Sequence, residues 1–465
     1  MLIINLLVAL LVPFTLGTCA LSSVISRNGL RLMEKFFLAM LAGIALQVIL
    51  MFILPFIKIP LTLAYILAGD LLVCLVMAIF LFFNKSFFFN RNELSQLTMP
   101  QGLTWIEISL MALMSLKFIY VFFEALIKPV IDIDAISMYS VGAKAIFIKH
   151  TFLDSFILQT IHDKPFFAYL SQAWLLISLQ SFNDCLIKLF YPIIFICLLG
   201  VFYSQARRFW PRQFSLLFTF LLSSFPFMVF HATTAYVDFS QTAYYAISTI
   251  YLFLFIKEID QKTQLTIAAH DFFTLSLVFL AFSLWIKRGG IFLAAINLVS
   301  IIMYLFIFKR KLLASQLRSF ILPAGYFILL TLPWIIYSQA SIFWGTLGVA
   351  TQEVATQASN TAAGSNFQVV FSTLLNKLFL YSDWHLLWGM FILATLFCLW
   401  KKTTRPILFL LTIIILNIFA LFFDFSLGHA FAYLLDGTLL DRLVMVSTPI
   451  VLFYCAEVFS PNPNS

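Results

Sequence analysis

Five short stretches of the sequence combine acidic, basic and aromatic residues in patterns that could do chemistry. They are Asp132-Ile133-Asp134, Lys144, His162-Asp163-Lys164, Tyr236-Val237-Asp238 and Lys287-Arg288. A positioned carboxylate can act as general base toward a hydroxyl or an amine. An adjacent Lys/Arg pair can hold a phosphate and stabilise the charge that develops as it leaves. A base that faces a phosphate site predicts group transfer from a phosphate-linked substrate.

Each stretch also has a simpler interpretation, which the residues alone leave open. Asp132 or Asp134 could be solvated loop residues, and Asp238 could cap a helix N-terminus. Lys287 and Arg288 could bind ordinary lipid headgroups. The histidines fit no zinc spacing, and the six cysteines show no metal or disulfide pattern. The choice between these interpretations depends on the elements that position these residues.

Composition restricts those elements to membrane helices. Of 465 residues, 62% are hydrophobic and only 10% are charged, whereas soluble domains carry about 45–50% and about 25%. A soluble globular protein, a disordered chain and a secreted disulfide scaffold are excluded. A porin-type barrel is excluded as well, because its short segments alternate and the apolar runs here are long. We expect an all-α integral membrane protein with about 13 transmembrane helices and interfacial helices on the outer face.

Hydropathy and charge together predict the threading. The predicted spans are 3–25, 37–57, 62–83, 105–127, 185–204, 214–230, 239–256, 266–286, 289–308, 319–338, 384–400, 406–423 and 440–459. The basic clusters share the cytoplasmic side if the N-terminus lies outside, the C-terminus lies inside, and the apolar stretch 165–182 does not cross. The net charge of +8 is then a topology signal and predicts no nucleic-acid partner.

Two outer segments and two charges within spans stand out in this threading. Segment 128–164, within the outer loop 128–184, contains Asp132, Asp134, Asp154 and Asp163, and loop 339–383 is predicted to be a flexible lid over the site. Lys287 and Arg288 lie on the outer side, against the charge rule, so an anionic ligand is expected there. Asp70 and Lys117 lie at similar depth, and we expect them to form an ion pair because intramembrane charges are usually paired.

Several of these motifs resemble those of GT-C glycosyltransferases, the polytopic enzymes related to protein O-mannosyltransferases and the lipid A aminoarabinose transferase. Asp134-Ala135-Ile136-Ser137-Met138-Tyr139 followed by Ala143-Lys144-Ala145 resembles their first outer loop. His162-Asp163-Lys164-Pro165 is similar to the start of their second interfacial helix. Tyr236-Val237-Asp238 and Leu284–Gly290 resemble later motifs, and Arg442 fits an outer arginine of the last span. The motifs cover about residues 105–310. Pro-Phe in place of Pro-Pro and Arg288 in place of Glu or Gly depart from the pattern.

The resemblance implies an enzyme that transfers a sugar from a polyprenyl-phosphate donor to a lipid, glycan or protein acceptor, with inversion, at the outer face of the inner (plasma) membrane. Asp134 would be the base, and Asp238 and Asp163 would orient substrate. Predicted substrate-binding residues are Asp132, Lys144, His162, Asp163, Lys164, Tyr236, Lys287, Arg288 and Arg442. No cofactor is predicted, although the carboxylates are compatible with a divalent cation. Residues 1–104, 105–310 and 311–465 would form N-terminal helices, catalytic module and C-terminal helices.

Three other functions remain open from the sequence. A transporter or flippase for a lipid-linked sugar would have two related halves and broken helices. An O-antigen polymerase or ligase would use outer arginines and histidines. A non-enzymatic membrane assembly protein is the third. The glycosyltransferase hypothesis makes a geometric demand: Asp134, Asp238 and Lys287 or Arg288 should face one cavity within about 10–15 Å of each other.

Overall fold

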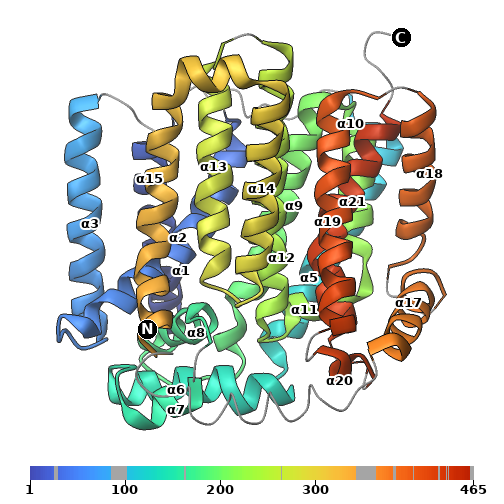
Figure 1. The fold of residues 1–465 in the computed structure, drawn as a ribbon. Coiled ribbons are helices and arrows are strands. Elements are labelled where there is room, and N and C mark those ends of the chain that lie inside the picture. The colour runs from blue at the N-terminus through green and yellow to red at the C-terminus, as the bar shows by residue number, and fades with distance from the viewer. Residues whose placement is uncertain are drawn as a thin grey trace.

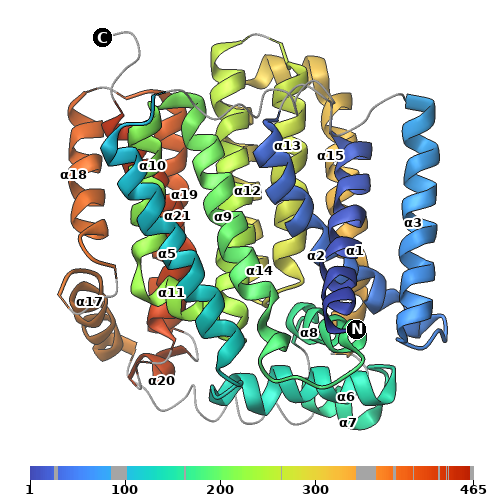
Figure 2. The same ribbon diagram turned by 180° about the vertical axis from the view of Figure 1, so that it is seen from behind.

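The chain folds as a bundle of helices, seen here in a computed structural model. It describes residues 1–25, 30–84, 102–161, 164–262, 264–341, 363–380, 384–401, 403–427, 430–435, 437 and 439–460, which contain helices and connecting segments but no strand. The long helices stand side by side in Figures 1 and 2. They are α1 (Leu2–Val24), α2 (Leu32–Phe56), α3 (Leu63–Asn84), α5 (Trp105–Ile127), α9 (Phe190–Phe209), α10 (Arg212–Ser224), α12 (Val237–Gln261), α13 (Ile267–Leu284), α14 (Gly290–Phe308), α15 (Arg310–Ser341), α18 (Leu387–Trp400), α19 (Arg405–Leu427) and α21 (Leu440–Phe459).

The helices have the length and composition of membrane spans. Among the described residues, ten are long and apolar enough to cross a bilayer, and α10 with α11 (Pro226–Thr233) adds a further span bent by 66°. A hydrocarbon core about 30 Å thick requires about 20 apolar residues per span. The multi-pass helical character is confirmed. Thirteen spans stay a prediction, because two predicted spans coincide with helices that are apolar over shorter stretches, Leu63–Ile79 and Leu387–Trp400.

Short helices gather at one end of the bundle, which we call the loop end. They are the π-helix η1 (Ala135–Ser140), α6 (Val141–Lys149), α7 (Ser155–Ile161), α8 (Phe167–Leu179), the 3-10 turn η2 (Leu186–Lys188), α17 (Ala363–Phe379) and α20 (Ala430–Leu435). The N-terminus lies at this end in Figure 1, and α21 ends at the opposite one. The two ends of the bundle at which α1 begins and α21 ends are therefore opposite, as predicted. Which end faces the cytoplasm stays a prediction.

Helix α8 explains why an apolar stretch need not cross. Its 13 residues are all buried, and it packs against α1, α2 and α6 at the loop end. The Trp174 indole N–H donates to the Ala9 carbonyl in α1 at 3.0 Å. The hydrophobicity of this segment therefore reflects burial beneath other helices, and segment 128–184 is a folded platform of short helices.

Carboxylates join the helix ends at the opposite end, which we call the basic end. Glu34 in α2 accepts from Arg208 at 2.7 Å and from Gln205 at 2.6 Å in α9. Lys257 in α12 donates to Glu457 in α21 at 3.0 Å. Arg208 and Lys257, which belong to two of the predicted basic clusters, thus link neighbouring helices at this end of the bundle.

The expected ion pair between Asp70 and Lys117 is wrong. Helices α3 and α5 stand far apart in Figures 1 and 2, and Lys117 instead donates to the Ser224 hydroxyl at 3.1 Å. Both oxygens of Asp70 are buried and have no hydrogen-bond partner among the described residues. Equal depth in a bilayer says nothing about which helices are neighbours, and this is why the prediction failed.

The structure describes only part of loop 339–383, which was predicted to be a flexible lid. The helix α17 (Ala363–Phe379) occupies its C-terminal part, so this portion is regular structure and not a flexible chain. Most of the rest of the loop lies outside the described residues.

Candidate functional site

Asp134 lies at the loop end, where the chain leaves α5 and turns into the platform. The π-helix η1 follows it directly, and π-helical turns occur frequently at functional sites. Its Oδ2 accepts a hydrogen bond from Arg442 Nη2 at 2.8 Å. Arg442 is the third residue of α21, so this contact joins residues 308 positions apart. The predicted base and the predicted outer arginine therefore meet.

Asp238 lies in the first turn of α12 and is paired with Lys287. Lys287 Nζ donates to Asp238 Oδ1 at 2.7 Å, and the Asp238 side chain is 4% exposed. Lys287 belongs to the tight turn between α13 and α14. A Cβ added to Gly290 there would lie 2.6 Å from the Ser283 carbonyl oxygen. The N-cap residue of α12 is Tyr236, and Asp238 is paired with Lys287, so ion pairing explains its position better than N-capping does.

Arg442 connects the two pairs into one cluster. Its Nε lies 3.9 Å from Asp238 Oδ2, in addition to the contact with Asp134. Its guanidinium also stacks over the Tyr236 ring, 4.6 Å from the centroid. We call Asp134, Arg442, Asp238 and Lys287 the charge relay. It places the two carboxylates within reach of one guanidinium.

His231 adjoins the charge relay, and it belongs to the same predicted outer loop as Tyr236 and Asp238. Its ring lies 5.4 Å from that of Tyr236 and is 1% exposed. Its Nδ1 has no hydrogen-bond partner among the described residues. A buried imidazole with an unpaired nitrogen beside charged groups is a candidate for binding or orienting a ligand.

Asp132 and Lys164 lie beside the charge relay without a direct bond to it. Burial raises the pKa of the Asp132 carboxyl, and the positive charges of Lys188 and Arg442 oppose that shift. Burial lowers the pKa of the Lys164 ammonium, while the Asp134 charge opposes it. Lys164 Nζ donates to the Met138 sulfur. Both residues are therefore close enough to contribute charge to a ligand held at Asp134.

The other predicted residues do not join the charge relay. Lys144 is placed over the Phe182 ring, 4.2 Å from its centroid, and so belongs to the packing of the platform. Arg288 is exposed and does not line the cavity described below. Of this adjacent pair, Lys287 forms the ion pair with Asp238. His162 and Asp163 lie outside the described residues.

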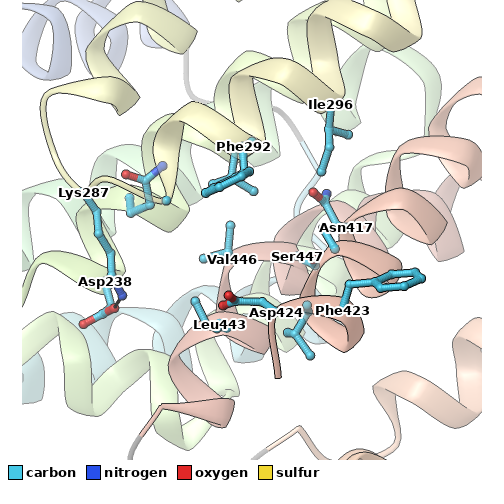
Figure 3. A pocket seen from close by; sticks show the side chains of 15 residues that line it. Asp238, Lys287, Phe292, Ile296, Asn417, Phe423, Asp424, Leu443, Val446 and Ser447 are labelled. Carbon is cyan, nitrogen blue, oxygen red and sulfur yellow. Dashed lines mark hydrogen bonds and ion pairs between the residues drawn. The ribbon is translucent and has the colours of Figure 1, made fainter. Parts of the chain in front are cut away.

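A cavity of about 490 Å³ opens beside the charge relay and extends between the helices (Figure 3). Asp238 and Lys287 lie together at one end, and Phe292, Ile296 and Val446 form an apolar wall. Its lining residues come from α12, the α13–α14 turn, α14, α19 and α21: Asp238, Gln241, Lys287, Gly289, Phe292, Leu293, Ile296, Asn417, Ala420, Leu421, Phe423, Asp424, Leu443, Val446 and Ser447. Neither Asp134 nor Arg442 is among the lining residues, and the two adjoin the cavity only through the contact of Arg442 with Asp238.

Polar side chains inside this cavity were not predicted. Gln241 is 2% exposed, and neither its amide nitrogen nor its oxygen has a hydrogen-bond partner among the described residues. Asn417 is bonded to the Tyr245 hydroxyl at 3.0 Å. A buried amide without partners is costly unless a ligand or water satisfies it. One helical turn from Asp238, Gln241 is placed to bind the polar part of a ligand.

The charge relay balances two carboxylates against two cations. A phosphate that binds Lys287 and Arg442 would compete with Asp238 and Asp134 for the same donors, and would release Asp134 to accept a proton. Among the described residues, no group of three or more His, Cys, Asp or Glu side chains is placed to hold a metal ion. The two cations can bind an anion, and the carboxylate of Asp134 beside them can accept a proton.

Comparisons of the chain with protein-family models, curated proteins and solved structures find no significant match. The likeness to GT-C enzymes therefore rests on the short motifs of the sequence. What the chain does must be argued from the site itself.

Proposed function

We propose that the protein is a membrane glycosyltransferase of GT-C type that takes a sugar from a polyprenyl-phosphate donor. The observation that carries the proposal is the charge relay, of which Asp238 and Lys287 line an apolar cavity between long apolar helices. A base, an anion site and an apolar cavity are the three things that a lipid-phosphate-linked substrate requires. The acceptor would be a lipid, a glycan or a protein.

In the proposed reaction, the acceptor hydroxyl oxygen attacks the anomeric carbon of the sugar and forms the new glycosidic bond. The bond between that carbon and the phosphate oxygen breaks, and polyprenyl phosphate leaves with the electron pair. The hydroxyl proton goes to the Asp134 carboxylate. Lys287 and Arg442 stabilise the negative charge on the departing phosphate. Attack from the face opposite the leaving group inverts the anomeric centre.

The split of roles between the two carboxylates follows from their surroundings. The Asp238 side chain is 4% exposed and held by Lys287, whereas that of Asp134 is 36% exposed. An acceptor arriving from the loop end can therefore reach Asp134 more easily. We assign Asp134 as the base and Asp238 as the group that holds Lys287 in place and orients sugar hydroxyls.

The proposal is tested by transfer in proteoliposomes. The purified chain is incubated with radiolabelled polyprenyl-phosphate sugars and membrane acceptors, and labelled product is separated from donor. Transfer with an inverted anomeric centre is expected for one donor class. Lys144→Met serves as a matched control, because this lysine belongs to the platform and should leave the rate unchanged. Absence of transfer with every donor class would overturn the proposal.

A transporter for the same lipid-linked sugar is the second candidate, and one observation favours it. The span made of α10 and α11 is broken at Phe225 with a bend of 66°, and broken helices are typical of transporters. The His385 ring at the loop end contacts the Ser224 carbonyl at this break. Movement of labelled donor between leaflets without any transfer would favour this alternative over the enzyme.

A further inference from the structure

A second cavity, of about 560 Å³, lies at the basic end of the bundle. It is enclosed by the start of α2 and by α5, α9 and α10. Its lining residues are Leu30, Arg31, Leu32, Met33, Phe37, Met114, Phe118, Ile196, Leu199, Gly200, Tyr203, Ser204, Arg207, Leu216 and Thr219. Most are apolar, none is acidic, and the two charged ones are both arginines. The candidate site at the loop end shares none of them.

The cavity has the depth of one membrane leaflet. Along α9 it extends from Arg207, at the end of the helix, to Ile196. Eleven residues at a rise of 1.5 Å span roughly 16 Å. Half of a hydrocarbon core about 30 Å thick is about 15 Å. An acyl chain that entered beside Arg207 would therefore reach about the midplane alongside Ile196.

The two arginines at its mouth have donors to spare. Arg31 Nη2 donates to the Arg207 carbonyl at 3.0 Å, and Arg207 Nη1 donates to the Trp210 carbonyl at 2.6 Å. Neither guanidinium forms an ion pair among the described residues, whereas their neighbour Arg208 is paired with Glu34. Each guanidinium carries five N–H donors, so most of the donors of Arg31 and Arg207 remain available.

Positive charge is crowded at this mouth. Burial and the nearby charges of Arg208 and Arg207 lower the pKa of Arg31, and Glu34 opposes the shift. Crowded cations beside an apolar cavity complement a ligand with an anionic head and an apolar tail. Clusters of basic residues at the cytoplasmic membrane surface attract anionic lipids.

We propose that this cavity binds one anionic phospholipid, independently of the reaction at the loop end. The phosphate lies between Arg31 and Arg207, where both guanidiniums can donate to its oxygens. One acyl chain lies along α9, between α2 and α5, as far as Ile196. The lipid would fill the groove between these helices and stabilise their packing at the basic end.

The test is native mass spectrometry of the full chain in detergent, titrated separately with dioleoyl-phosphatidylglycerol and dioleoyl-phosphatidylcholine. Tighter retention of one phosphatidylglycerol molecule is expected. Arg31→Gln with Arg207→Gln should weaken it by roughly 10- to 30-fold, from the contribution of two basic residues near a membrane surface. Arg310→Gln is the matched control, because Arg310 is an exposed cation at the same end that does not line the cavity.

A second variant tests the tail separately from the head. Ile196→Trp fills the deep part of the cavity and leaves both arginines in place, so phosphatidylglycerol retention should fall. Equal retention of both lipids by the wild-type chain would overturn the proposal. So would wild-type retention by the double arginine variant. Competition by inorganic phosphate, combined with no effect of Ile196→Trp, would show a soluble-anion site and overturn the lipid assignment.

Discussion

Replacement of Lys287 by Met is the most informative perturbation of the charge relay. It removes the only hydrogen-bond donor to the buried Asp238 carboxylate among the described residues, a contact of 2.7 Å. Removal of one partner from a buried ion pair costs about 3–5 kcal/mol. The Lys287 side chain is 29% exposed and Arg442 remains 3.9 Å from Asp238, so we expect a loss below that range, about 2–3 kcal/mol.

Thermal denaturation in detergent measures this loss, and we expect the midpoint to fall by on the order of 5 °C. Lys287→Met combined with Asp238→Leu replaces the whole pair by apolar groups, which is often neutral for stability. We expect this double variant to recover the wild-type midpoint and still to lack transfer. An unchanged midpoint in Lys287→Met would refute the reasoning that the pair is buried and stabilising. Recovery of transfer in the double variant would refute its role in the reaction.

Three further predictions follow from named contacts. Gln241→Leu should raise the KM for the donor about tenfold, the effect of one lost hydrogen bond, without lowering the denaturation midpoint, because the amide has no protein partner. Because burial lowers the pKa of Lys164, this lysine should lose its charge at lower pH than a free lysine does, and the donor KM should therefore rise as the pH is raised. Lys164→Arg stays charged and should keep the donor KM low. Identical pH profiles of KM for the two proteins would contradict a role of Lys164 in donor binding. Gly43→Ala should destabilise the protein by at least about 1–3 kcal/mol in thermal denaturation, because the added Cβ would lie 1.7 Å from the Pro13 carbonyl oxygen in α1. The control is Gly69→Ala, whose Cβ would meet only the flexible Leu50 side chain at 3.4 Å and should be tolerated.

The sequence was sufficient to predict the helical elements, because hydropathy reports directly on the apolar length of each segment. The placement of charges also predicts that the stretch 165–182 does not cross, and its helix α8 lies among the short helices of the loop end; the non-crossing itself stays a prediction. The bend at Phe225 was missed. The signal was present, since the residue before a proline is disfavoured in helical conformation and Pro226 follows.

The sequence could not predict which helices are neighbours in the bundle. Depth in the membrane can be counted along a helix, but the neighbours of that helix cannot. The supposed partnership of Asp70 with Lys117 failed for this reason, and the contact between Asp134 and Arg442 could be proposed only through a resemblance. The lining of the cavity by Gln241 was hidden because a glutamine within an apolar helix gives no sign of the direction it faces.

The most direct test of the central claim compares Asp134→Asn with Asp132→Asn in the transfer assay. Asparagine preserves the shape of the side chain and its contact with Arg442 but cannot take the proton. We expect Asp134→Asn to lower the rate of transfer by about 10²–10⁴-fold, the contribution of a positioned general base, with donor binding largely retained. Asp132→Asn should cost far less, because this carboxylate has no direct bond to the charge relay. Transfer by Asp134→Asn at a near wild-type rate would contradict the account.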